Sequence, residues 1–196
     1  MKTNKIIAVV ACAAMLMSTA ACGQKTKKAA DSVANGPEKA LVAYFSASET
    51  GNTRVLAKKV AEAAGADLYE ITPDTLYTAA DLDWTVEDSR STIEMRDSTS
   101  RPAIKGTVEN LADYNVVYVG FPVWWNSAPH VVNTFFETND LSGKTIWLFG
   151  TSGGTTLAGA LKDLKAAYPA LDIKGAELLN GATQEQVADY VAKTRE

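Results

Sequence analysis

Cysteine and histidine, which many enzymes use as nucleophiles, bases or metal ligands, are nearly absent from this sequence. Its 196 residues include 2 cysteines and 1 histidine, and both cysteines, Cys12 and Cys22, fall near the N-terminus. The remainder of the chain therefore offers no disulfide, no thiol nucleophile and no cysteine metal site. With His130 as the single histidine, we expect no bound metal.

An excess of positive charge is also missing. The chain has 19 lysines and arginines against 23 aspartates and glutamates, a formal net charge of −4 and a pI of about 5.1. Nucleic-acid-binding proteins usually carry a basic face, so nucleic acid is not expected as a partner. The length and a hydrophobic content of 46% are those of one ordinary globular domain.

The first residues have the pattern of an export signal. A short cationic start, "MKTNK", precedes an apolar run that is short for a membrane span and ends in small residues before Cys22. This ending resembles the lipobox of bacterial lipoproteins, which implies a signal peptide at 1–21 and a lipidated Cys22. Residues 22–38 would comprise that cysteine and a flexible tether, and the domain would lie outside the cytoplasm, attached to the membrane through the lipid alone. A plain secretory signal and an uncleaved anchor are the alternatives.

From residue 39 onward, apolar runs alternate with helical patterns. We expect strands at 40–46, 67–71, 114–124, 144–152 and 172–180, and helices at 53–65, 128–138, 156–168 and 183–194. This alternation predicts an α/β domain over 39–196, with a parallel sheet covered by helices on both faces. Ligands of such sheets bind at the carboxyl ends of the strands.

One long segment, 72–113, interrupts the alternation. It exceeds the length of an ordinary loop, and within it "TVEDSRSTIEMRD" (85–97) could form a short helix. The remainder is irregular and partly aromatic. We therefore expect an insertion that lies over the site as a lid.

Three strand ends carry unusual residues. The first, Ser46 to Thr53, is rich in hydroxyls and has a glycine before a helix, which suits a phosphate monoester, although such residues are also ordinary turn formers. It lacks the lysine of a nucleotide-triphosphate loop. The second (120–129) has adjacent tryptophans, of which we expect one to pack against the insertion and one to line a site for a flat ligand. The third strand end (150–155) consists of small residues, several of which carry hydroxyls.

Four segments in this order resemble a branch of the bacterial flavodoxin-like proteins. "SETGNT" (48–53) looks like the FMN-phosphate loop of flavodoxins, and "GFPVWWNSAP" (120–129) and "FGTSGG" (149–154) resemble the loops that hold the isoalloxazine ring. The insertion carries the segments "DLDW" and "SRPAI", which are common in that branch. The resemblance implies a flavodoxin-like three-layer sandwich, a five-stranded parallel sheet of order 2-1-3-4-5, and tightly bound FMN.

The resemblance also implies a role for each loop. The phosphate would be held by Ser46, Ser48, Thr50, Gly51, Asn52 and Thr53; the ring would be flanked by Pro122, Val123, Trp124 and Trp125 and closed in by Thr151, Ser152, Gly153 and Gly154. Asn126 stands where the family often has a glycine whose peptide flips beside flavin N5. Asparagine tolerates a left-handed backbone better than most residues.

Two other features suggest catalysis. "GTSGG" matches the nucleophile-elbow pattern G-x-S-x-G, but that hydrolase fold requires a histidine after the serine, and His130 precedes it. His130 itself is expected in the first turn of a helix beside the tryptophans. It would serve either as a proton donor to reduced flavin or substrate, or as an ordinary surface or supporting residue.

The resulting hypothesis is an FMN-binding redox protein. It would exchange electrons with a partner protein, or reduce a small flat acceptor such as a quinone. The alternative is a cofactor-free flavodoxin-like binding module at the cell surface.

Overall fold

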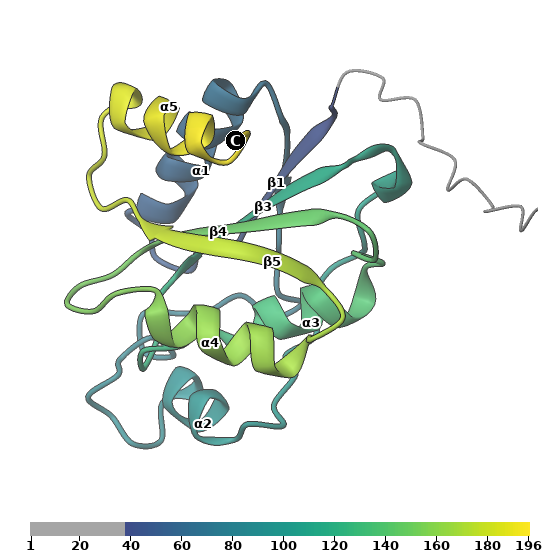
Figure 1. The fold of residues 1–196 in the computed structure, drawn as a ribbon. Coiled ribbons are helices and arrows are strands. Elements are labelled where there is room, and N and C mark those ends of the chain that lie inside the picture. Colours follow the sequence, from purple (N-terminus) through teal and green to yellow (C-terminus); the bar gives the residue numbers. More distant parts are fainter. Residues whose placement is uncertain (1–37) are drawn as a thin grey trace, which may run out of the picture. The chain divides into compact units, whose positions relative to one another are not determined.

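Five parallel strands form one sheet in the order β2-β1-β3-β4-β5 (Figure 1). The strands are β1 (Ala40–Tyr44), β2 (Asp67–Glu70), β3 (Val116–Pro122), β4 (Thr145–Thr151) and β5 (Asp172–Leu178). The structure is a computed structural model and describes residues 38–196; the predicted signal peptide, Cys22 and the tether up to residue 37 lie outside the described residues. The predicted strand order and parallel pairing are confirmed.

Helices cover the sheet on both faces. They are α1 (Asn52–Ala64) and α5 (Gln184–Lys193) on one face, and α3 (His130–Thr138) and α4 (Ala158–Ala167) on the other (Figure 1). Alternate residues of each strand face the two layers, so Val42 packs toward α1 and α5 whereas Ala43 belongs to the core beneath α3 and α4. Central strands that are apolar on both faces are therefore a requirement of this architecture.

Local sequence signals fix the end of α1 and the start of α5. Gly65 ends α1 in the left-handed conformation, with φ 63°, as glycine after a helix commonly does. Thr183 and Gln186 form both halves of the capping box that begins α5. Pro129, expected in the first turn of α3, lies just before that helix because its ψ of 140° is extended rather than helical.

The insertion at 72–113 is mostly irregular. It contains the helix α2 (Arg90–Arg96), inside the predicted span, and a single 3₁₀ turn, η1 (Leu111–Asp113). Tyr77 attaches the insertion to the sheet: its ring packs edge-on against Phe45, its hydroxyl donates to Glu94, and the Arg90 guanidinium lies 3.9 Å from its ring centre. Within residues 38–196, no helix is long and apolar enough to cross a membrane.

Candidate functional site

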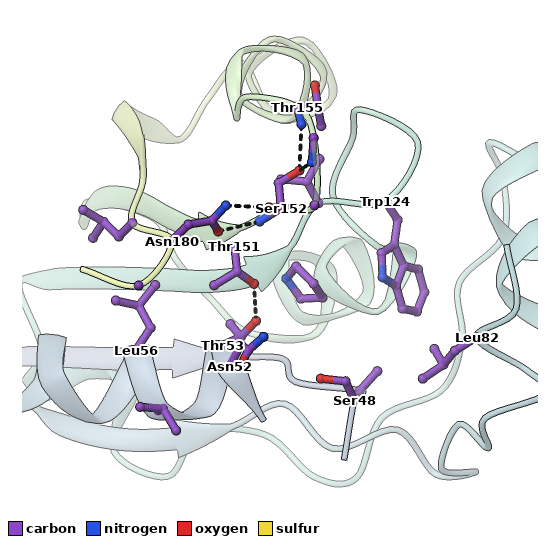
Figure 2. Close-up of a pocket in the computed structure, with 18 of the residues that line it drawn as sticks. Ser48, Asn52, Thr53, Leu56, Leu82, Trp124, Thr151, Ser152, Thr155 and Asn180 are labelled. Carbon is purple, nitrogen blue, oxygen red and sulfur yellow. Dashed lines mark hydrogen bonds between the residues drawn. The ribbon is translucent and has the colours of Figure 1, made fainter. Parts of the chain in front are cut away.

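One pocket of about 1050 Å³ opens at the carboxyl edge of the sheet (Figure 2). The loops after β1, β3, β4 and β5 form it together with the start of α1 and part of the insertion. Predicted residues that line it are Ser48, Asn52, Thr53, Pro122, Val123, Trp124, Trp125, Asn126, Thr151, Ser152, Gly153 and Gly154. The tertiary structure thus brings the three predicted loops together.

The pocket also has lining residues that the sequence did not single out. They are Val55, Leu56 and Lys59 from α1, Leu82, Trp84 and Ser91 from the insertion, Leu179 to Ala182 after β5, and Ala47 and Thr155. Conversely, Ser46, Thr50 and Gly51 belong to the first loop without lining the pocket. The Ser46 hydroxyl is buried and has no hydrogen-bond partner among the described residues.

The first loop leads into an uncapped helix. Gly51 is the N-cap of α1 and has φ 63°, so a left-handed residue is required there, and its N–H donates to the Ser48 carbonyl at 3.0 Å. No side chain caps α1 and no acid lies in its first turn. The first N–H groups of a helix have no partner within the helix and attract anions. The start of α1 is therefore a ready anion site, with Asn52 and Thr53 on the pocket wall.

Thr53 also joins two of the loops. Its side chain is buried, and its hydroxyl bonds the hydroxyl of Thr151 at the end of β4, 2.8 Å away (Figure 2). This contact fixes the start of α1 against the third loop. A substitution that removes either hydroxyl would leave the other without its partner.

The tryptophan loop is a tight turn. Trp124 and Ser127 exchange backbone hydrogen bonds of 3.0 and 2.8 Å, and the two residues between them, Trp125 and Asn126, have φ of 44° and 63°. Two consecutive left-handed residues define a type I′ turn. The expectation that Asn126 would accept this conformation is confirmed, whereas a left-handed Trp125 was not foreseen.

The turn is held against the start of α4. The Thr155 hydroxyl donates to Asn126 Oδ1 at 2.6 Å, and the Ser127 hydroxyl donates to Asp163 Oδ2 at 2.8 Å. Gly159 permits this close approach, because a Cβ there would overlap the Asn126 carbonyl oxygen. The position of the turn thus depends on a glycine 33 residues further along the chain.

The two tryptophans differ in environment. Trp124 packs edge-on against Phe45 and against Tyr77 of the insertion, at ring distances of 5.6 and 5.3 Å. Trp125 is 46% exposed. The prediction that one tryptophan packs against the insertion is confirmed for Trp124, but the expected division of roles is not observed, because both tryptophans line the pocket.

Asn180 fixes the third loop in place. Its Oδ1 accepts from the Ser152 N–H at 2.8 Å, and its Nδ2 donates to the Ser152 carbonyl (Figure 2). The Ser152 hydroxyl accepts from the N–H of Thr155 at 3.0 Å, which makes it a turn cap rather than a free nucleophile. Asn180 was not predicted as a site residue, although an Asn-Gly pair at the end of the fifth predicted strand (172–180) could have indicated a fourth loop at the same edge.

His130 lies at the start of α3 but does not line the pocket. Burial and the positive charge of Arg101 lower its pKa, while Glu94 and Asp97 act in the opposite direction. These three residues belong to the insertion, and none of them lines the pocket. The structure therefore does not bring the candidate proton donor to the pocket.

Five parallel strands in this order, covered by helices on both faces and carrying the pocket at their carboxyl ends, define a flavodoxin-like α/β protein. A family model described as flavodoxin matches residues 39–194, and the chain belongs to the flavodoxin family. No curated protein matches it significantly.

Several solved structures are similar to this chain. A provisionally assigned flavoprotein from Bacteroides eggerthii is 44% identical, with a TM-score of 0.77 over 81% of this chain and 98% of its own. Another from Bacteroides uniformis is 49% identical, with a TM-score of 0.76 over 79% of this chain and 98% of its own. A flavoprotein from Lactobacillus acidophilus in complex with FMN is 18% identical, with a TM-score of 0.58 over 76% and 98%, and shares the fold.

Proposed function

We propose that this protein binds FMN in the pocket and uses it to reduce a small planar acceptor. The observation that carries the proposal is the uncapped, acid-free start of α1, which opens into a pocket walled by Trp124 and Trp125. An anion site beside aromatic walls matches a ligand with a phosphate at one end and a flat ring at the other. Membership of the flavodoxin family and the two provisionally assigned flavoprotein relatives support it.

The residues of the chain fit this cofactor. N–H groups and hydroxyls of the first loop and α1, including Ser48, Asn52 and Thr53, would hold the phosphate. The indoles and the third loop, kept in place by Asn180, would hold the ring and exclude water from it. Bound FMN supplies the redox chemistry, and the protein positions it and adjusts its environment.

Purified full-length protein is expected to be yellow, and apoprotein is expected to quench the fluorescence of added FMN at one FMN per chain. The physical reason is that the ring becomes stacked against indoles inside the pocket. Fluorescence titration of FMN, with riboflavin as the phosphate-free comparison, measures this. Colourless protein that leaves FMN fluorescence unchanged would contradict the proposal and favour the cofactor-free binding module.

Electron exchange with a partner protein is the second candidate function. A potentiometric titration of the loaded protein separates the two. Reduction in one two-electron step supports an acceptor reductase, whereas two well-separated one-electron steps support a shuttle. The volume of the pocket, at the upper end of the range for sites that enclose one drug-sized ligand, favours the reductase.

We further propose that the chain is a lipoprotein anchored through Cys22, on the strength of the cationic start, the apolar run and the small residues before that cysteine. In a bacterial host, the full chain should incorporate labelled fatty acid and remain with membranes. Cys22→Ser should abolish the label, whereas Cys12→Ser should keep it. Equal labelling of both variants would refute lipidation at Cys22.

A further inference from the structure

We infer that the insertion forms a separate subsite of the pocket, in which Trp84 and Ser91 bind a planar, uncharged acceptor that carries a carbonyl-type acceptor atom. This inference rests on the proposed function, because the acceptor would lie beside bound FMN. Leu82, Trp84 and Ser91 are the pocket residues contributed by the insertion. Figure 2 shows Leu82 on the Trp124 side of the pocket, well apart from Asn180.

Trp84 presents an open indole to the pocket. It is 73% exposed, the largest exposed fraction among the exposed large hydrophobic side chains of residues 38–196, yet it lines the pocket. The turn that carries it is fixed by Asp83, whose carboxylate accepts from the Thr85 N–H at 3.0 Å and from the Thr85 hydroxyl at 2.6 Å. A solvent-exposed indole that lines a pocket is a stacking surface for a flat ligand.

Ser91 supplies a hydrogen-bonding atom close to the Trp84 turn, because its N–H donates to the Asp81 carbonyl at 2.9 Å. Its side chain is 2% exposed, and its hydroxyl has no partner among the described residues. The neighbouring hydroxyls of Ser89 and Thr92 bond each other at 2.8 Å, so Ser91 is the one of these three residues whose hydroxyl lacks a partner. A buried hydroxyl without a partner destabilises the protein, and a ligand atom that accepts its proton would remove that cost.

The lining contributed by the insertion has no charge to pair with an ionic acceptor, and therefore favours a neutral one. Lys59 is the one lining residue with an ionisable acid or base, and its Nζ donates to the Ala182 carbonyl at 2.6 Å. That contact lies at the β5–α5 loop, and the insertion brings no charged side chain to the pocket wall. A flat, neutral molecule with a carbonyl oxygen, such as a quinone, matches an indole, an aliphatic side chain and a free hydroxyl.

The test uses FMN-loaded protein and 2-methyl-1,4-naphthoquinone as the probe, with binding measured by calorimetry. Trp84→Ala should weaken probe binding about tenfold, through the loss of stacking. Ser91→Ala should weaken it about three- to tenfold and, because an unsatisfied hydroxyl is removed, raise the melting temperature of ligand-free protein by about 2–4 °C. Ile93→Ala and Leu76→Ala, at exposed insertion residues outside the pocket lining, are matched controls and should change neither quantity appreciably.

Three outcomes would overturn the subsite. Unchanged probe affinity in both pocket variants shows that the probe binds elsewhere, and a lowered melting temperature for Ser91→Ala shows that its hydroxyl is structural. Weaker FMN binding in Ser91→Ala, with the probe affinity unaffected, assigns the hydroxyl to the cofactor. Failure of the wild-type protein to bind FMN is a separate result, which refutes the proposed function itself.

Discussion

Replacing Asn52 with aspartate should weaken FMN binding by about 100-fold and, at the same time, stabilise the ligand-free protein. Asn52 is the first residue of α1, lines the pocket and is exposed, and α1 has no acid in its first turn. A new carboxylate there interacts favourably with the helix dipole, which stabilises the folded protein by about 0.3–1 kcal/mol. The same charge repels a bound phosphate, and juxtaposed like charges cost several kcal/mol, hence the large loss of affinity.

Fluorescence titration and thermal unfolding measure the two effects of Asn52→Asp. Riboflavin, which lacks the phosphate, should bind the variant and the wild type equally. Lys58→Gln changes the net charge by the same amount at an exposed position of α1 away from the pocket, and should alter FMN affinity less than about threefold because salt screens distant charges. Undiminished FMN binding by Asn52→Asp would show that the phosphate does not lie at the start of α1.

Replacing Gly159 with alanine should both destabilise the domain and displace the tryptophan turn. The new Cβ would overlap the Asn126 carbonyl oxygen and press on its side-chain amide, so either α4 or the turn has to move. Forcing extra atoms into a packed contact typically costs about 1–3 kcal/mol. Since Trp125 and Asn126 line the pocket, we also expect FMN affinity to fall at least about tenfold.

Chemical denaturation and FMN titration measure these effects of Gly159→Ala. Lys162→Ala, at an exposed position of the same helix, should leave the stability and the FMN affinity close to those of the wild type. Gly154→Ala is the control for the glycine change itself in the stability measurement, since a Cβ there meets no atom within 4 Å. Wild-type stability and affinity in Gly159→Ala would mean that the turn is not held by its contact with α4.

Much of the fold could be predicted because its signals are local. The positions of strands and helices follow from the periodic spacing of apolar residues. The end of α1 at Gly65 follows from a left-handed glycine, and the start of α5 at Thr183 follows from a capping box. The strand order itself came from the resemblance to flavodoxins, since periodicity alone does not say which strands are neighbours. The start of the helix predicted at 128 was misplaced by two residues, because Pro129 precedes the first helical residue, although a proline also suits the first helical position.

The sequence by itself determined the three loops of the candidate site, because hydroxyls, glycines and paired tryptophans at strand ends are locally unusual. Only the tertiary structure decided that Asn180 binds Ser152, that Thr155 binds Asn126, and that His130 does not line the pocket. It alone also brought Trp84 and Ser91 to the pocket wall. Local propensities act over a few residues, whereas these contacts join segments about thirty or more residues apart and depend on how the layers pack.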